Sequence, residues 1–450
     1  MKETAIVVFD IGKTNKKVLL FNEEYRLISE TEQKFPEIPD DDGFLCDDIE
    51  HIESWIRETL ISLLRSDKYD IRAVNFTTYG ATIVYLDKNG KRLTPVYNYL
   101  KPMDEKIQES LYKRYGGRDE FCRRTASPAL GMLNSGIQVL WLKSEKPGIY
   151  AKVNAILHFP QYLSYTLTGK IFSEHTSIGC HTALWDFDMM RYHSWTENYG
   201  LNLPEPVPVT TLSETEIDGR KINIGIGIHD SSASLAPYFS GSQGKFILLS
   251  TGTWCISMNP FNNEILTAEE LDNDCLCYMS ISMRPVKSSR LFLGYLHEEA
   301  LKIISAHFGK ATGYYKKIKT DRKLSDAMKE KFRGEMFFFS SSGFIHELKE
   351  NIDMYVFSSF DEAYQELMNE LAFFTIGSIR LILPGNDDTR NIYITGGFSK
   401  NEIFVDHIVN AFPSKQVWVS EIANASALGA ALVVSGSGNT PNLGLTRCTS

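Results

Sequence analysis

The chain has 450 residues, of which 43% are hydrophobic and 23% are charged, and its formal net charge is −9. This composition predicts an ordinary globular protein of two or three domains, and the acidic balance argues against a protein that binds nucleic acid or a membrane surface. Seven scattered cysteines, an N-terminus without a basic and apolar leader and the absence of a long apolar run favour a reduced, cytoplasmic protein with no membrane span.

The first predicted element is a hairpin with a polar tip. An apolar run from Ala5 to Phe9 indicates a buried strand, and a second run from Val18 to Phe21 follows after a short turn. The turn carries a carboxylate at Asp10, a glycine at Gly12 and several lysines. Backbone N–H groups in such a turn can surround a phosphate, and a carboxylate can hold Mg²⁺. From these residues alone, an ordinary hairpin tip is an equal alternative.

The rest of the first half reads as alternating strands and helices. The strand that ends at Thr77-Thr78-Tyr79-Gly80 is the notable one, because ligands bind at the carboxyl ends of strands in open α/β sheets. The patterns predict strands over 27–35, 71–76 and 83–86 and helices over 49–64 and 155–167. A stretch rich in Pro, Thr and Glu, residues 203–217, is the expected linker.

After the linker the pattern starts again with a second polar-tipped hairpin. We expect strands over 222–228, 246–249, 255–258, 391–395 and 417–419, and helices over 291–308, 363–383, 400–412 and 423–434. Such a duplication places a ligand between the halves. The expected domains are residues 1–217 and 218–435, followed by a loose tail over 436–450.

Three glycine-bearing turns follow predicted strands, at Gly12, Gly252 and Gly396-Gly397. Together they offer backbone donors from both halves to one polyphosphate, although none has the P-loop or dinucleotide-binding spacing. Asp230 lies between an apolar strand and a helix start that is rich in small residues. It is either a helix N-cap or a general base for phosphoryl transfer, and the two roles are compatible.

The segments FDIGKTNKK, GIHDSSAS, LLSTGTW, YITGGFSKN and ASALGAAL resemble the FGGY family of carbohydrate kinases, in order from about residue 5 to residue 435. The runs HDSSAS, STGTW and FPQYLSYTLTGK are most similar to the L-rhamnulose and L-fuculose kinase branch. The resemblance implies an α/β fold of two actin-like (ribonuclease-H-like) domains that flank a central cleft, with the sugar mainly on the first domain and ATP mainly on the second.

The resemblance also implies roles for individual residues. Asp230 matches the catalytic base, and Asp10 matches the carboxylate that engages Mg²⁺. The residues expected to bind ATP are Gly12, Lys13, Thr14, Asn15, Lys17, Thr251, Gly252, Thr253, Gly396, Gly397 and Asn401. Those expected to bind the sugar are Thr78, Tyr79, Gly80, Gln161, His229 and Asp230.

Some positions depart from the family pattern. Lys17 stands where an Arg is common, whereas Lys13 and Lys16 replace small hydroxyl residues. Thr82 stands where this branch usually has an acidic residue, and Gln161 stands where the family commonly has Asp. The last two departures lie near the expected sugar site, so they put the identity of the acceptor in doubt.

The resemblance therefore implies ATP-dependent, Mg²⁺-dependent phosphorylation of a hydroxyl of a ketose or deoxyketose of the L-rhamnulose or L-fuculose type. The expected partner is a small sugar, not a nucleic acid or membrane, and the family likeness favours a homodimer. One alternative is a kinase of another pentulose or of a polyol. Another is an actin-like or chaperone-like ATPase that acts on a protein partner; it would share the phosphate hairpins but would not need Asp230.

Overall fold

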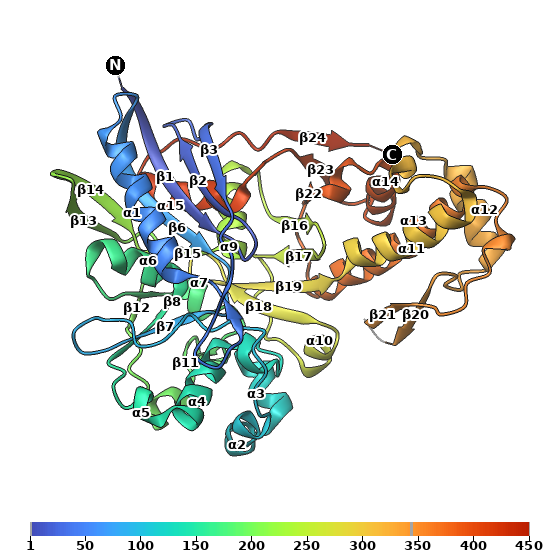
Figure 1. Ribbon diagram of the computed structural model, residues 1–450. Helices are drawn as coiled ribbons and strands as arrows, with labels where there is room; N and C mark the ends of the chain where they lie inside the picture. The colour runs from blue at the N-terminus through green and yellow to red at the C-terminus, as the bar shows by residue number, and fades with distance from the viewer. Residues whose placement is uncertain (1, 343–344, 450) are drawn as a thin grey trace.

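The computed structural model describes residues 2–342 and 345–449 of the chain. Two mixed sheets of seven strands each form its framework, one at the left of Figure 1 and one nearer its centre. In the described ranges, every helix is too short or too polar to cross a bilayer.

The first sheet has the strand order β13-β14-β6-β1-β2-β3, and β15 lies beside β6. The hairpin β1–β2 is antiparallel, whereas β6 runs parallel to β1 on its other side. The bounds are β1 (Glu3–Ile11), β2 (Lys16–Phe21), β3 (Leu27–Gln33), β6 (Tyr69–Thr78), β13 (Leu212–Ile217), β14 (Arg220–Gly225) and β15 (Ile228–His229).

The second sheet repeats this plan, with the order β18-β19-β17-β16-β22-β23-β24. The hairpin β16–β17 corresponds to β1–β2, the parallel strands β22 and β23 correspond to β6 and β14, and the antiparallel strand β24 corresponds to β13. The bounds are β16 (Phe246–Thr251), β17 (Cys255–Asn259), β18 (Cys275–Met279), β19 (Pro285–Leu291), β22 (Asn391–Gly396), β23 (Gln416–Ser420) and β24 (Leu445–Cys448). The predicted duplication and the predicted α/β fold class are therefore confirmed.

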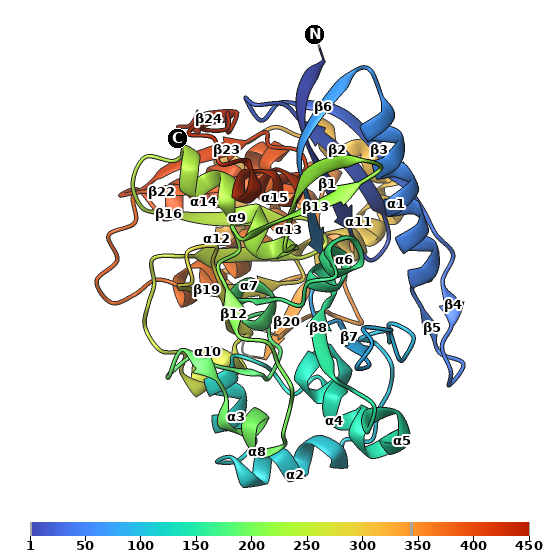
Figure 2. The same ribbon diagram turned by 90° about the vertical axis from the view of Figure 1, so that its left-hand side faces the viewer.

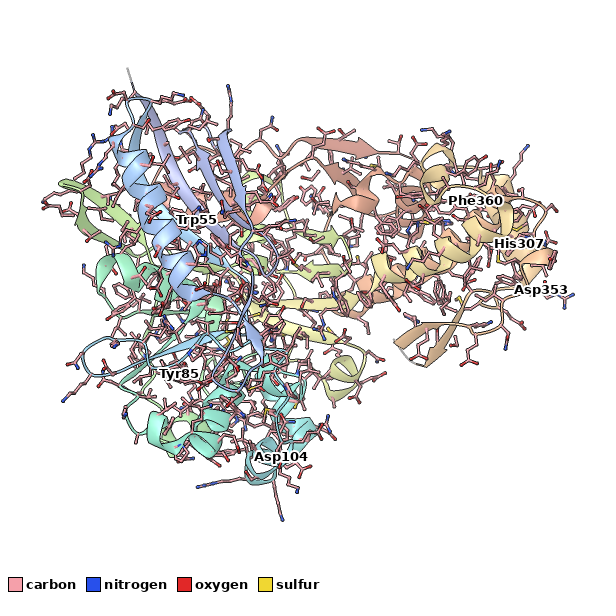
Figure 3. The ribbon with its side chains drawn as sticks, in the orientation of Figure 1. Trp55, Tyr85, Asp104, His307, Asp353 and Phe360 are labelled. Atoms are coloured by element: carbon pink, nitrogen blue, oxygen red, sulfur yellow. The ribbon has the colours of Figure 1, made fainter. Side chains whose placement is uncertain are left out.

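Helices cover the outer faces of both sheets and fill the space between them (Figure 2). Helices α1 (Ile49–Arg65) and α6 (Phe159–Thr168) pack on the first sheet. The ring of Trp55, a residue of α1 that is labelled in Figure 3, meets the ring of Phe9 edge to face, with 5.5 Å between the ring centroids. Helices α9 (Asp230–Gly241) and α15 (Ala425–Ser435) lie between the sheets.

Helices α11 (Leu293–Phe308), α13 (Phe360–Leu381) and α14 (Glu402–Ala411) cover the outer face of the second sheet. His307 and Phe360 mark the far end of the α11–α13 pair in Figure 3. Central strands of both sheets, such as β1 and β16, carry apolar residues on both faces, and each face packs into a separate core cluster.

Smaller elements fill the rest of the chain, and those between β7 and β13 form the lower part of Figure 1. In the first part of the chain they are β4 (Ile38–Pro39), β5 (Leu45–Cys46), β7 (Ile83–Leu86), α2 (Lys106–Arg114), α3 (Arg118–Thr125), η1 (Gly131–Leu133), α4 (Ser135–Glu145), α5 (Pro147–Tyr150), β8 (Ala155–His158), β9 (Ser173–Glu174), α7 (His175–Ile178), β10 (Trp185–Asp186), β11 (Arg191–Tyr192), α8 (Ser194–Asn198) and β12 (Pro206–Val207). In the second part they are α10 (Ala268–Asp272), η2 (Thr312–Lys317), α12 (Arg322–Phe332), β20 (Phe339–Ser342), β21 (Ile345–Leu348), η3 (Met354–Val356) and η4 (Gly397–Lys400).

The structure differs from the sequence predictions in three places. The helix predicted over 155–167 begins only at Phe159, because Pro160 fits the first turn of a helix but not its interior and Ala155–His158 pairs with β7. The expected linker contains β13, and the boundary predicted between residues 217 and 218 falls in the turn of the β13–β14 hairpin, so the first sheet continues to His229. The tail expected to be loose contains β24, which pairs with β23; its last residue, Ser450, lies outside the described ranges.

Candidate active site

Two carboxylates lie at one edge of the first sheet. Strand β6 pairs in parallel with β1, where Asp10 is opposite Thr77, and with β15, where Ile228 is opposite the same Thr77. Asp230 follows β15 as the first residue of α9. Asp10 and Asp230 therefore lie on either side of β6, at the carboxyl ends of the strands, which is where open α/β sheets bind ligands.

The environment of both carboxylates disfavours their charged forms. Burial raises the pKa of Asp10 to about 7, and the charge of Asp230 acts in the same direction, against the opposing charge of Lys17. Burial also raises the pKa of Asp230 to about 6, although its Oδ1 accepts a hydrogen bond from the Ser231 N–H at 2.6 Å. Raised pKa values at a sheet edge are typical of functional carboxylates. A bound divalent cation would offset the repulsion between the two groups, so this pair fits Mg²⁺ chemically.

A neutral histidine lies against Asp230. The Nε2 atom of His229 is 3.1 Å from Oδ1 of Asp230 and 3.2 Å from Sγ of Cys180. Burial lowers the pKa of His229 to about 4, so this imidazole is uncharged at neutral pH. A Cβ atom at Gly80 would lie 3.1 Å from both Cys180 Sγ and His229 Nε2, so a larger residue here would push these two side chains outward. Cys180 carries no sequence signal that distinguishes it from the other buried cysteines.

The loop that precedes Asp230 is held by buried hydrogen bonds. Nε2 of Gln161 donates to the carbonyl oxygens of Gly227 at 3.1 Å and of Ile226 at 3.3 Å. The His229 N–H donates to Oγ1 of Thr176 at 3.1 Å, and that hydroxyl donates to Glu174 at 2.7 Å. The amide of Gln161 thus positions the loop. Glu174 and Thr176, which also hold it, were not among the residues predicted from the sequence.

The other predicted sugar residues divide into two groups. Gly80, His229 and Asp230 come together at the sheet edge. Thr78 instead donates its hydroxyl to the carbonyl of Tyr79 at 2.9 Å, and Tyr79 donates its own hydroxyl to Asp47 at 2.6 Å. The polar groups of these two side chains are therefore engaged within the protein.

The lysines of the first turn are paired with carboxylates. Nζ of Lys13 lies 2.7 Å from Glu37 and 3.1 Å from Asp47, and Nζ of Lys16 lies 2.7 Å from Asp47. Lys17 pairs with Glu30 at 2.7 Å and also donates to Asn424 at 3.2 Å. Phosphate donors that remain in this turn are the backbone N–H groups of Lys13, Thr14 and Asn15, which have no hydrogen-bond partner in the described part of the chain.

The turn after β16 has the same design. The Gly252 N–H donates to the carbonyl of Trp254 at 2.8 Å, as the Gly12 N–H donates to the carbonyl of Asn15 at 3.0 Å. Oγ1 of Thr251 donates to the Thr395 carbonyl at 2.5 Å and accepts from the Phe398 N–H at 3.1 Å. These bonds join the turn at Gly252 to the turn at Gly396 and Gly397, so the two predicted phosphate turns form one unit.

A cavity of about 510 Å³ opens beside these two turns. Its volume suits a cofactor-sized ligand. Residues on its wall include Gly252, Thr253, Gly294, His297, Leu301, Gly313, Tyr315, Gly397, Phe398 and Asn401. Asn401, expected to bind ATP, belongs to this wall. Its side chain also caps α14: Oδ1 accepts from the Phe404 N–H at 3.1 Å, and Nδ2 donates to the hydroxyl of Tyr364 at 2.8 Å.

The two halves meet next to Asp230. Oγ of Ser232 donates to the carbonyl of Met279, on β18 of the second sheet, at 2.7 Å. On the same strand, the ring of Tyr278 lies 6.4 Å from the imidazole of His229. The base candidate therefore follows a strand of the first sheet, and its neighbours His229 and Ser232 contact the second sheet.

Comparison with known proteins finds a family similarity in the N-terminal part of the chain. Residues 5–205 match the model of the FGGY family of carbohydrate kinases, N-terminal domain. A rhamnulokinase from Oceanobacillus iheyensis is 24% identical over 275 residues, which cover 58% of this chain and 57% of that protein. The chain spans about half the length of the curated relatives that it matches.

Solved structures extend the similarity to both halves. A carbohydrate kinase from Novosphingobium aromaticivorans superimposes with a TM-score of 0.82 at 22% identity, covering 99% of this chain and 94% of that chain. A ligand-bound xylulose kinase from Lactobacillus acidophilus gives a TM-score of 0.76 at 15% identity, covering 96% and 88%. At these identities the likeness concerns the fold, and it confirms the expected pair of actin-like domains.

Proposed function

We propose that this chain, which carries the N-terminal domain of the FGGY family of carbohydrate kinases, transfers the γ-phosphoryl group of ATP to a hydroxyl of a small sugar. One observation carries the proposal: Asp230 stands beside Asp10 at the carboxyl edge of the first sheet, where strand β18 of the second sheet meets it. Phosphoryl transfer needs positioning, charge neutralisation and one base, and this edge offers groups for each.

In this proposal Asp230 is the general base. The sugar hydroxyl oxygen forms a bond to the γ-phosphorus, the bond from phosphorus to the β–γ bridging oxygen breaks, and ADP leaves. The hydroxyl proton passes to the Asp230 carboxylate. A base with a pKa of about 6 is mostly ionised at neutral pH and is still basic enough to accept a proton in the transition state.

The nucleotide is assigned to the second half. The cavity beside Gly252 and Gly397 would take the adenosine, and the N–H groups of Thr253 and Trp254, which lack a partner in the described ranges, would bind phosphate oxygens. Asp10 would hold Mg²⁺ directly or through water, and the ion would neutralise the phosphate charge. Lys13 and Lys17 would act on phosphate only through their charge, because carboxylates already bind their ammonium groups.

For the acceptor we favour a deoxyketose or ketose of the L-rhamnulose or L-fuculose type. The support is the similarity to proteins named rhamnulokinase, together with the sequence runs that flank Asp230. The departure at Gln161 does not weigh against this acceptor, because its amide binds the loop at Ile226 and Gly227.

Release of ADP from Mg-ATP, measured with L-rhamnulose, L-fuculose, D-xylulose, L-ribulose, D-ribulose, glycerol or no acceptor, tests the proposal. We expect ADP release that depends on the acceptor and is fastest with one of the first two sugars. Equal ADP release with and without every acceptor would support the ATPase alternative instead.

A further inference from the structure

Asp47 binds side chains from two different ligand turns. It follows β5, its side chain is almost fully buried, and its backbone forms an isolated bridge with Val96. Oδ1 accepts from Lys16 at 2.7 Å, and Oδ2 accepts from Lys13 at 3.1 Å and from the Tyr79 hydroxyl at 2.6 Å. The lysines belong to the first phosphate turn and its following strand, whereas Tyr79 belongs to the turn after β6.

On the phosphate side, the geometry fixes the shape of the turn. The side chain of Lys16 is 1% exposed, and its Nζ also donates to the carbonyl of Lys13 at 3.0 Å. A buried ammonium group needs an opposite charge close by, and Asp47 supplies it. Because Lys16 holds a carbonyl of the turn itself, the carboxylate of Asp47 orients the segment that carries the unpaired N–H groups of Lys13 and Thr14.

On the acceptor side, Tyr79 connects Asp47 to the residues around the base candidate. The centroid of its ring lies 5.6 Å from that of Phe159 and 5.9 Å from that of Tyr99. Its backbone N–H donates to the carbonyl of Ile11 at 3.3 Å. The next residue, Gly80, packs so closely against His229 and Cys180 that a Cβ atom on it would lie 3.1 Å from each of them. A continuous series of contacts therefore runs from the phosphate turn through Asp47 and Tyr79 to the neighbours of Asp230.

We propose that Asp47 is a positioning residue that holds the phosphate turn at Gly12 and the acceptor turn at Gly80 as one unit. Its kinetic consequence rests on the proposed kinase function, whereas the coupling of the turns is a property of the fold. An ion pair that served stability alone would involve the lysines but would not need the hydroxyl of Tyr79.

Tyr79→Phe is the main test variant, because it leaves the buried pair of Lys16 and Asp47 intact. Tyr162→Phe is the matched control: it removes a hydroxyl that donates to Glu53, also at 2.6 Å, outside these turns. Amide hydrogen exchange of peptides spanning residues 11–17 and 76–82 is compared in both variants. We expect roughly 2- to 10-fold faster exchange in both peptides for Tyr79→Phe, the range for one lost hydrogen bond, and no change for Tyr162→Phe.

Kinetics provide the second readout. For Tyr79→Phe, kcat/KM should fall roughly 2- to 10-fold for ATP and for the sugar together. Combining Tyr79→Phe with Asp47→Asn should cause no further loss beyond Asp47→Asn alone. Faster exchange confined to residues 76–82, or an equal effect of Tyr162→Phe on residues 11–17, would overturn the proposal. If the unmodified protein phosphorylates no sugar, the kinase assignment fails, and the exchange measurement still decides the coupling.

Discussion

The imidazole of His229 presents an acceptor nitrogen to Asp230, with Nε2 and Oδ1 3.1 Å apart. Ser232 donates its hydroxyl proton to the carbonyl of Met279, so its oxygen can only accept from Nδ1 of His229, 3.3 Å away. This network assigns the proton to Nδ1 and leaves the lone pair of Nε2 facing the carboxylate. Once Asp230 takes up a proton, it has a hydrogen-bond acceptor in place, which suits a general base.

Asp230→Asn removes the base while it keeps the shape of the side chain. We expect kcat to fall by roughly 10²–10⁴-fold, the usual contribution of a general base. The affinity for ATP should stay within about twofold, because the nucleotide cavity is lined by residues of the second half. Rapid-quench measurement of the sugar phosphate and calorimetric titration with an ATP analogue check the two statements. Turnover near that of the unmodified chain would contradict the assignment.

The pH dependence follows from the raised pKa of Asp230. Because this carboxyl titrates at about 6, it is protonated and inactive below that pH. We expect kcat/KM for the sugar at saturating Mg-ATP to fall about tenfold per pH unit below pH 6 and to be level above about pH 7. Direct chromatography of ADP avoids coupling enzymes that are themselves sensitive to pH. A flat profile down to pH 5 would show that another group accepts the proton.

Sequence patterns anticipated the parts of the fold that local chemistry determines. Apolar runs such as Ile247–Leu249 and Ile392–Ile394 form buried central strands, and the turns after them fall where Gly and Thr were expected. The start of α6 was misplaced because the strand that ends at His158 and the helix that begins at Phe159 follow each other without a loop between them. Pairing across the chain settled that point, since Ala155–His158 binds β7.

The sequence pattern did not predict in which direction individual side chains point. Lys16 and Asp47 are 31 residues apart in sequence, so nothing local shows that the lysine points away from the phosphate turn. Gln161 was expected to bind the sugar, yet its amide binds backbone carbonyls. The catalytic candidates Asp10 and Asp230 were identifiable because strand ends limit where their side chains can lie.

Gln161→Leu tests whether this residue selects the sugar or holds the loop. The structure predicts the second role, because Nε2 bonds the carbonyls of Ile226 and Gly227. We expect kcat to fall by roughly 5- to 50-fold for every accepted sugar, from loss of two buried hydrogen bonds, with the ranking of the sugars unchanged. The measurement is kcat/KM across the sugar panel. A changed ranking with little loss of kcat would instead make Gln161 a specificity residue.

Asp10→Asn should change folding stability and kinase activity in opposite directions. Because burial raises the folded-state pKa of Asp10 from 3.8 to about 7, the folded protein binds this proton more tightly than the unfolded chain does. The resulting stabilisation is complete below about pH 4 and is lost as pH rises through 7. At pH 8 without Mg²⁺, the variant should therefore be more stable by roughly 1–2 kcal/mol, and equal to the unmodified chain at pH 4.

Urea unfolding at the two pH values, with and without Mg-ATP, provides the measurement. Mg-ATP should stabilise the unmodified chain more than the variant, and the variant should lose most of its kinase activity. If the variant is the less stable protein at pH 8, other groups of the protein already compensate the charge of Asp10, and a bound cation is not needed for this.

Gly396 and Gly397 should respond differently to alanine. Gly396 has φ 87° and ψ −157°, a region that is almost restricted to glycine, and a Cβ there would meet the carbonyl of Thr251. Gly396→Ala should therefore cost about 1–3 kcal/mol of unfolding free energy and raise KM for ATP. At Gly397 a Cβ meets no protein atom within 4 Å, so Gly397→Ala should leave stability unchanged.

If the nucleotide approaches this turn, Gly397→Ala should still raise KM for ATP by roughly tenfold, because the added methyl group occupies the space of a ligand atom. Thermal melts together with ATP titrations distinguish the two effects, and an unchanged KM for ATP in both variants would remove this turn from the nucleotide site.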